Sequence, residues 1–256
     1  MPLTYHLTLQ LDREAPQATA AALHASVYHL IEEVDMPLSR ELHAANQNPL
    51  SLGHTRREGF GGVLGSDGRT LQCRVHLLDE RLATALTEAW APGVTLPVRE
   101  RQRLSGRVVG CWTQVTAYED LWPQAAPPEV TLNFHSPTVL RAGDSFIDRP
   151  ASRVLLHGLL RRWNAFAPQP MPDACWGWVD TGVETLHEDL WQDLTAWPKG
   201  GRSLRVPAFM GEVTYALPTG EAGRSLAALC RLAGWSGVGA KTLFGYGETV
   251  ARLSAG

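Results

Sequence analysis

A glycine-rich run between residues 234 and 247 constrains the fold of this chain more than any other stretch. It reads GWSGVGAKTLFGYG and places five glycines around one lysine, Lys241. Each glycine loses more backbone entropy on folding than another residue would, so such a run indicates tight turns or close approach to a ligand. Successive backbone amides in a tight turn form a concavity that suits an anion, and Lys241 would add a positive charge beside it. We expect a phosphate-binding loop here, and a turn without a ligand is the alternative.

The run differs from the nucleotide-binding P-loop in two respects. Gly234 and Gly239 have the spacing of that motif, but Ala240 stands where the motif needs its lysine. A P-loop also opens a helix, whereas the sequence that follows, TLFGYGETVARL, is typical of a strand. Both differences disfavour a nucleotide-hydrolysing enzyme.

Composition indicates a globular protein rather than a membrane protein. Hydrophobic residues make up 44% of the chain, and no apolar run has the length of a membrane span. The first residues lack a secretory signal, and the four cysteines form no Cys-x-x-Cys pair, so we expect a cytoplasmic protein without a structural zinc site. The net charge of −3 counts against a nucleic-acid binder, but basic residues are grouped locally. The groups are Arg56–Arg57, Arg99–Arg107, Arg161–Arg162 and Lys199–Arg205.

The order of predicted elements is that of the ferredoxin-like fold, twice over. Residues 5–11 alternate as a half-buried strand, Pro16 opens a helix that Pro37 ends, and two strands, a helix and further strands follow up to residue 118. Three prolines between residues 123 and 128 mark a boundary. A strand, a long helix, a strand, a helix and a final strand follow, although residues 171–200 carry no clear pattern. We predict an α+β protein of two tandem ferredoxin-like (RRM-like) domains, 1–122 and 129–256.

Four stretches resemble a known family of RNA-processing enzymes. They are ELHAANQNPLSLG, NFHSPTVLR, FMGEVTYAL and the glycine-rich run, which occur in that order along the chain. Together they are similar to the CRISPR-associated endoribonucleases of the repeat-associated (RAMP) superfamily, which cut precursor transcripts into guide RNAs. The resemblance implies a double ferredoxin-like fold and cleavage within CRISPR repeat RNA, which leaves 2',3'-cyclic phosphate and 5'-hydroxyl ends. The alternative is a noncatalytic RNA-binding subunit of a CRISPR effector complex.

The residue types in the chain suit this chemistry without a metal or other cofactor. In RNA the 2'-hydroxyl next to the scissile phosphate can attack it, so the protein has to transfer protons and stabilise charge. Histidine can do the first at neutral pH. The sequence has neither a His-Glu-x-x-His pattern nor a carboxylate cluster. We therefore expect a metal-independent enzyme.

His43 is the strongest candidate for proton transfer. It lies in a polar segment between Pro37 and Pro49 that we expect to be an exposed loop. The family's catalytic histidine lies in a Leu-His pair followed by Pro-x-Ser, matched here by Leu42, His43, Pro49 and Ser51. An ordinary surface histidine is the alternative. His54 is the second candidate, and the histidines within predicted helices and strands, His24 among them, are expected to be structural or exposed to solvent.

The resemblance also implies partners for His43. In some members a tyrosine at the distance of Tyr28 assists proton transfer, although a tyrosine packed beside the apolar stripe of its helix is equally expected here. A lysine that those members carry after the histidine is absent. Arg40, Arg56 or Arg57 could replace it, and of these we assign Arg40 a catalytic role.

The remaining RNA contacts are expected to be electrostatic, with basic side chains holding phosphates. The stretch AWPKGGRSLR is predicted to be a hairpin loop that enters an RNA groove, and a solvated turn is the alternative. The predicted RNA-binding residues are Arg56, Arg57, Lys199, Arg202, Arg205, Gly237, Gly239, Lys241 and Thr242. CRISPR repeat RNA is the expected partner, and effector-complex subunits and a second copy of the chain are further candidates.

Overall fold

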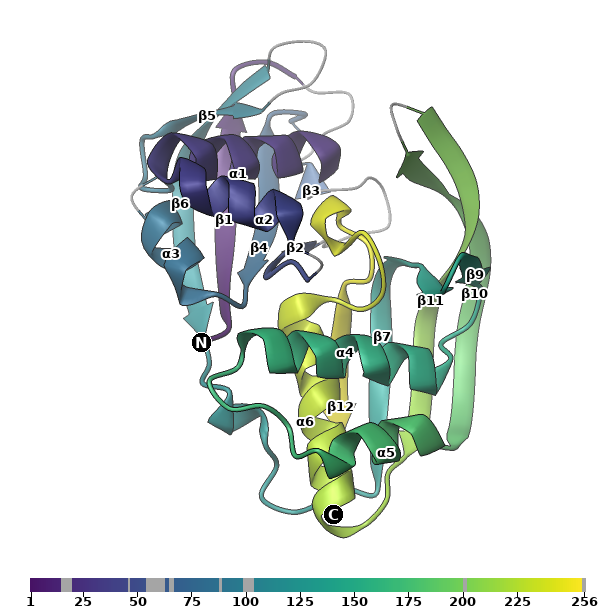
Figure 1. Cartoon of the computed structure of the whole chain (residues 1–256). Coiled ribbons are helices and arrows are strands. Elements are labelled where there is room, and N and C mark those ends of the chain that lie inside the picture. Colours follow the sequence, from purple (N-terminus) through teal and green to yellow (C-terminus); the bar gives the residue numbers. More distant parts are fainter. Residues whose placement is uncertain are drawn as a thin grey trace. The chain divides into compact units, whose positions relative to one another are not determined.

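A computed structural model of the chain describes residues 1–14, 20–45, 47–53, 63–64, 67–87, 89–98, 104–199 and 202–254. The described residues form two units, which Figure 1 shows in the colours of the sequence. The first comprises Met1–Ala117 together with Leu243–Gly245, and the second comprises Tyr118–Thr242 together with Tyr246–Gly256. Helices and antiparallel sheets occur in both units, which confirms the predicted α+β class.

The first unit is built on a six-stranded sheet with the order β2-β4-β1-β6-β5, in which β3 also pairs with β4. Helices α1, α2 and α3 lie against one face of this sheet (Figure 1). The order β6-β1-β4-β2 within it is that of a ferredoxin-like sheet. The strands are β1 (Leu3–Leu11), β2 (Leu50–Gly53), β3 (Val63–Leu64), β4 (Thr70–Leu77), β5 (Thr95–Val98) and β6 (Leu104–Val115), and the helices are α1 (Ala20–Val34), α2 (Met36–Ala44) and α3 (Glu80–Thr87).

Alternation along β1 positions the core of this unit. Tyr5, Leu7, Leu9 and Leu11 are all buried against the helices, as the sequence predicted. Ile31 of α1 is fully buried in the same core. The apolar contacts of α1 therefore fix which of its side chains face inward and which remain near the surface.

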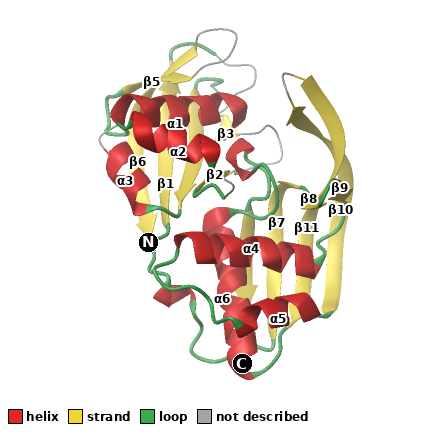
Figure 2. Cartoon of the chain, viewed as in Figure 1, coloured by secondary structure: helices red, strands yellow, loops and turns green. Residues whose placement is uncertain are grey.

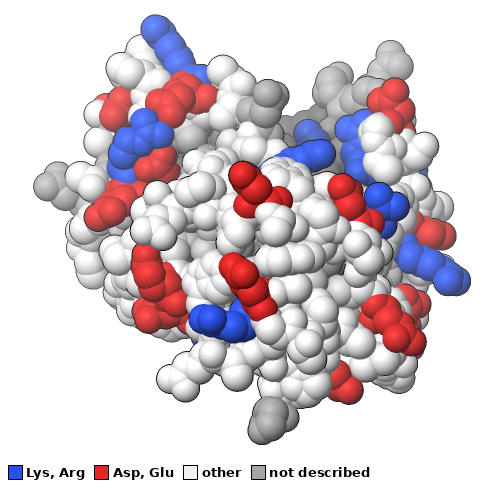
Figure 3. All heavy atoms as spheres, turned by 60° about the horizontal axis from the view of Figure 1, so that its bottom comes forward, with Lys and Arg blue, Asp and Glu red and all other residues white. Residues whose placement is uncertain are grey.

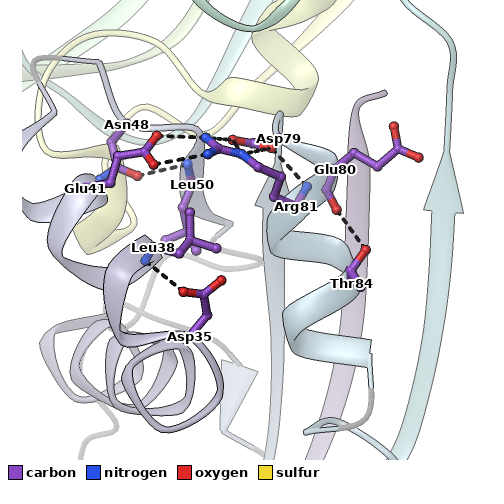
Figure 4. A network of polar contacts seen from close by, with 9 residues as sticks. All are labelled: Asp35, Leu38, Glu41, Asn48, Leu50, Asp79, Glu80, Arg81 and Thr84. Carbon is purple, nitrogen blue, oxygen red and sulfur yellow. Dashed lines mark hydrogen bonds and ion pairs between the residues drawn. The ribbon is translucent and has the colours of Figure 1, made fainter.

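The loop predicted between Pro37 and Pro49 is wrong in its first part, because α2 occupies Met36–Ala44. Pro37 ends α1 as expected, but it also lies in the first turn of α2, where its fixed φ suits a helix start and its missing N–H costs nothing. The side chain of Asp35 caps this helix by accepting a 2.9 Å hydrogen bond from the Leu38 amide (Figure 4). His43 is consequently held on a helix.

The second unit repeats the arrangement with a four-stranded sheet of order β10-β11-β7-β12. Figure 2 shows its helices in red on one side of the yellow strands. The segment without a clear sequence pattern forms α5 and the edge strand β10. The elements are η1 (Glu119–Leu121), β7 (Glu129–Thr138), β8 (Leu140–Ala142), β9 (Ser145–Ile147), α4 (Ser152–Phe166), α5 (Ala174–Thr181), β10 (Thr185–Lys199), β11 (Arg202–Ala216), α6 (Gly220–Ser236) and β12 (Thr249–Leu253). The short helix η2 (Thr242–Phe244) has its first residue in this unit and its other two in the first unit.

The surface bears charges of both signs. On the face shown in Figure 3, carboxylates lie between lysine and arginine side chains, as the small net charge of −3 would suggest. No helix among the described residues is long and apolar enough to cross a membrane.

Candidate functional site

Four aromatic rings form a continuous row in the first unit. His24 and Tyr28 lie one turn apart on α1, and their ring centroids are 4.6 Å apart. The ring of His43, on α2, lies 4.4 Å from that of Tyr28, and the ring of Phe244 stacks 4.7 Å from that of His24. We call Phe244, His24, Tyr28 and His43 the ring row. Two imidazoles thus flank one phenol.

His43 lies in the last turn of α2 and is exposed. The His43 side chain is therefore exposed, as expected, although it lies on a helix and not on a loop. A side chain on a helix whose start is capped is held in a narrower range of positions than one on a free loop. His43 can thus meet a substrate from solvent while its ring remains against Tyr28.

Tyr28 is a core residue, which corrects its expected position beside the apolar stripe of α1. It is 6% exposed and belongs to the hydrophobic core of the first unit. Burial raises the pKa of its hydroxyl above 10, and the hydrogen bond from Asn48 opposes part of that rise. Tyr28 therefore keeps its proton at neutral pH and can act as a hydrogen-bond donor.

Asn48 connects Tyr28 to the segment that follows α2. Its side-chain amide donates to the Tyr28 hydroxyl at 2.6 Å and lies 3.4 Å from the carbonyl oxygen of Leu42. Its side-chain oxygen accepts a 3.0 Å hydrogen bond from the backbone amide of Leu50, at the start of β2 (Figure 4). One side chain thus links α1, the end of α2 and β2 around the ring row.

A charged network holds α2 from its other side. The guanidinium of Arg81 donates to both carboxylate oxygens of Glu41, at 3.1 and 2.8 Å, and to Asp79 at 2.7 Å (Figure 4). Arg81 lowers the pKa of the Glu41 carboxyl through hydrogen bonds and charge. Arg81 and Glu41 are both exposed, so their ion pair adds little to the stability of the fold. Its two parallel hydrogen bonds nevertheless orient α2 relative to the start of α3.

The predicted basic residues are placed unequally. Arg40 is exposed on α2, three residues before His43, and its guanidinium lies 3.3 Å from the Met36 sulfur. Arg205 is exposed on β11, where its guanidinium lies 3.5 Å from the Leu194 carbonyl. Pairing of Lys199 with Arg202 confirms the predicted hairpin. Arg56, Arg57, His54 and the side chains of Lys199 and Arg202 lie outside the part of the chain that the structure describes.

The glycine-rich loop follows the C-terminal end of α6. Gly237, Gly239 and Gly247 all have positive φ, and a Cβ on Gly247 would lie 1.8 Å from the Val238 carbonyl oxygen. The Val238 amide donates to the Gly247 carbonyl at 2.7 Å, which closes the loop. Lys241, with φ of 61°, has the one positive φ among the described residues that are not glycine. The loop is thus a closed turn that requires glycine at Gly239 and Gly247, where an added Cβ would lie 2.5 and 1.8 Å from backbone oxygens.

Arg162 of α4 supports this loop from within the second unit. Its guanidinium donates to the carbonyls of Ser236 at 2.8 Å, Gly237 at 2.6 Å and Gly239 at 3.1 Å, and to the Thr242 hydroxyl at 3.3 Å. Desolvation lowers its pKa to about 10. Thr242, predicted to bind RNA, is buried with its hydroxyl turned to Arg162.

The sequence pattern predicts that His24 is structural or exposed to solvent and places Arg162 only within a basic pair, yet the position of each carried a signal for the contacts described here. His24 precedes Tyr28 by four residues, so both had to lie on one helix face. Arg162 occupies a position of the apolar stripe of α4, three residues after the buried Leu159 and seven after the buried Leu155. A charged residue at such a position needs buried partners. Among the residues described, no group of histidine, cysteine and carboxylate side chains could hold a metal ion.

Comparison with known proteins finds chains of similar fold and sequence. Residues 132–249 match the family model of the CRISPR-associated endoribonuclease Cas6. A product complex of a Thermus thermophilus Cas6 is 25% identical, with a TM-score of 0.79, and the similarity covers 98% of this chain and 100% of that one. A product complex of a second Cas6 is 28% identical with a TM-score of 0.75 and the same coverage. A substrate-mimic complex of the second protein is 27% identical with a TM-score of 0.70, over 98% and 99% of the two chains. Among curated protein sequences, none matches.

Proposed function

Because the chain belongs to the Cas6 family of CRISPR repeat-RNA-processing endoribonucleases, we propose that it cleaves repeat RNA at the ring row. The observation that carries the proposal is the exposed imidazole of His43 packed on Tyr28, with His24 on the other side of the phenol. Solved relatives in complex with a product and with a substrate mimic support repeat RNA as the ligand.

In the proposed reaction, the RNA 2'-hydroxyl attacks the adjacent phosphorus and the bond to the 5'-oxygen breaks. The products are a 2',3'-cyclic phosphate and a 5'-hydroxyl. One proton leaves the nucleophile and one reaches the leaving oxygen, so two proton-transfer groups suit the step. We assign these two roles to His43 and His24. Tyr28 separates the two rings and, as a protonated phenol, can donate a hydrogen bond to the phosphorane.

Single-turnover cleavage tests the assignment of His43. His43→Ala should slow cleavage by about 100-fold or more, whereas affinity for repeat RNA should barely change, since proton transfer acts only in the transition state. His29→Ala is a matched control, because His29 follows Tyr28 on the same helix and pairs with Glu33 at 3.1 Å. Wild-type rate in His43→Ala would remove the assignment.

Altered substrates distinguish the two histidines and test the nucleophile. A sulfur in place of the 5'-oxygen leaves without a proton, so it should restore cleavage in the variant that lacks the general acid and not in the other. A 2'-deoxy nucleotide before the scissile phosphate should abolish cleavage in the wild type. Normal cleavage of the deoxy substrate would show that water is the nucleophile.

We further propose that the reaction needs no metal ion, because the nucleophile is part of the substrate and histidines transfer the protons. Cleavage should proceed in EDTA. Loss of activity in the chelator and its return with magnesium or manganese would contradict this mechanism.

The second candidate function is that of a noncatalytic RNA-binding subunit of an effector complex. The supported glycine-rich loop is compatible with it, because binding alone needs no proton transfer. If wild-type protein bound repeat RNA tightly and cut neither the natural nor the deoxy substrate, this function would replace the enzyme.

A further inference from the structure

The glycine-rich loop follows the C-terminal end of a helix, and that end of a helix is unfavourable for binding a phosphate. Helix α6 contains 17 residues and ends at Ser236, with Gly237 as its C-terminal cap. The C-terminal end of a helix carries partial negative charge and carbonyl groups without partners in the helix. Phosphate-binding loops of nucleotide enzymes avoid this problem because they precede a helix N-terminus. A phosphate at the present loop would meet charge of the wrong sign unless something neutralised it.

Arg162 occupies the position from which that charge can be neutralised. Two of its hydrogen bonds go to the carbonyls of Ser236 and Gly237, at the end of α6 itself. A third goes to Gly239, within the loop. Each bond turns a carbonyl toward α4. The guanidinium thus gives hydrogen bonds to carbonyl groups at the end of α6, and its positive charge offsets their partial negative charge on the side that faces α4.

The charge of Arg162 is retained and is not cancelled by an acid. Its lowered pKa of about 10 still leaves the guanidinium protonated at neutral pH. None of the ion pairs found among the described residues joins Arg162 to a carboxylate. Its positive charge is therefore directed at the carbonyls of the helix end and of the loop.

We propose that Arg162 is a positioning residue for RNA binding, which neutralises the C-terminal end of α6 so that the outer part of the loop, Gly239–Lys241, can accept an RNA phosphate. Arg162 itself does not touch the RNA. This inference rests on the proposed function for the identity of the ligand, but it concerns the sign of the charge at the loop, which can be measured separately.

Three variants of the full chain separate charge from shape. Arg162→Met removes the cation and keeps most of the volume, Arg162→Lys keeps the cation without the fork, and Arg161→Met removes the same charge from the exposed neighbour. At low salt, Arg162→Met should bind repeat RNA about 10-fold or more weakly, whereas Arg162→Lys and Arg161→Met should stay within about 3-fold of wild type. Thermal unfolding of each variant checks that it is folded.

RNAs with a single uncharged methylphosphonate linkage show where the charge acts. If Arg162 serves one phosphate at the loop, the affinity difference between wild type and Arg162→Met should disappear when that linkage is neutral and persist when another is. A merely structural role predicts that Arg162→Lys, once folded, binds as weakly as Arg162→Met, and that result would overturn the proposal. So would a folded Arg162→Met with wild-type affinity.

Inorganic pyrophosphate tests the loop without RNA. It should raise the melting temperature of the wild type and of Arg162→Lys, and not that of Arg162→Met. If pyrophosphate behaves in this way and the wild type fails to bind repeat RNA, the proposed function is wrong while the anion site holds. If the wild type cleaves repeat RNA and pyrophosphate protects every variant equally, the function holds while the role of Arg162 is wrong. If Arg162→Met does not fold, the comparison of Arg162→Lys with wild type decides.

Discussion

The side-chain amide of Asn48 donates a 2.6 Å hydrogen bond to the hydroxyl of Tyr28. The phenol is buried between two imidazoles, and this bond fixes the position of the one polar atom of the ring. Because Asn48 is the donor, the proton of the Tyr28 hydroxyl can point elsewhere. Asn48 therefore orients the phenol without using up its capacity to donate.

Asn48→Ala should slow cleavage while RNA affinity changes little. The variant leaves the Tyr28 hydroxyl and the Leu50 amide without their partner, so we expect a loss of stability of about 1–2 kcal/mol and about a 10-fold lower single-turnover rate. Gln47→Ala, at the adjacent position, is the control. Cleavage by Asn48→Ala at the wild-type rate would show that Tyr28 needs no such support.

The Arg81–Glu41 pair makes a second prediction, about the orientation of α2. If the pair acts as a unit, Arg81→Met, Glu41→Gln and the double variant should slow cleavage by a similar factor, about 2- to 5-fold, because the second substitution has nothing left to break. The effect should shrink at high salt, since both side chains are exposed. Additive losses in the double variant would mean that the two residues act independently.

The sequence predicted well where one periodicity governs a segment. The inward residues of β1 and the sharp turns at Gly237 and Gly239 follow from alternation and from backbone sterics, which are local. The sequence does not reveal helix α2 readily, because Pro37 signals the end of a preceding helix, although with Asp35 before it a proline also begins a helix. A sequence motif identified His43 as a candidate, but the motif did not indicate that His43 lies on a helix.

The remaining misses depend on tertiary contacts. Strand β10 lies at the edge of its sheet and exposes Leu186, Trp191 and Leu194, so burial imposes no alternation on it that a sequence pattern could reveal. The ring of His24 stacks on that of Phe244, 220 positions later in the chain. Arg162 likewise acts on carbonyl groups more than 70 residues away, which no local pattern encodes.

Lys241 provides a third prediction, which concerns RNA affinity. Lys241→Ala should weaken repeat-RNA binding at low salt and reduce the salt dependence by about one unit of slope or less, as expected for one phosphate contact. Titrations at several salt concentrations measure both quantities. An unchanged affinity with an unchanged slope would return the loop to the alternative of a turn without a ligand.

The fourth prediction is a pH dependence caused by His76. This side chain is 6% exposed, its Nδ1 lies 2.7 Å from the Thr4 hydroxyl, and its Nε2 lies where a Cβ on Gly53 would come within 2.7 Å. Burial, with smaller effects of the charges of Arg74 and His6, lowers the pKa of His76 to about 3. In the unfolded chain this imidazole binds a proton near pH 6.5, whereas in the folded protein it binds one only near pH 3.

The contribution of His76 to the free energy of unfolding should therefore be fully present above about pH 6.5. It should fall as the pH decreases toward 3, by up to about 1.4 kcal/mol per pH unit. His76→Gln cannot titrate, so its free energy of unfolding should depend less steeply on pH across that window. Denaturant unfolding at several pH values gives the difference between the two proteins. Parallel curves would mean that His76 is protonated in the folded state.

The last prediction tests whether the glycine-rich loop has the shape described. Gly247 has a φ of 69°, and an added Cβ would lie 1.8 Å from the oxygen and 2.8 Å from the carbonyl carbon of Val238, both backbone atoms that cannot rotate away. Moving them would break the hydrogen bond from the Val238 amide to the Gly247 carbonyl. Gly247→Ala should therefore lower the free energy of unfolding by about 3 kcal/mol or more, of which the left-handed backbone alone accounts for about 1–2.

Gly158→Ala is the control, because Gly158 lies within α4 with open space around its Cβ position, and it should stabilise the protein by up to about 1 kcal/mol. Chemical denaturation of both variants measures the difference. If Gly247→Ala unfolded at the same denaturant concentration as the wild type, the close approach of Val238 would be wrong, and with it the closed loop on which the proposed phosphate binding depends.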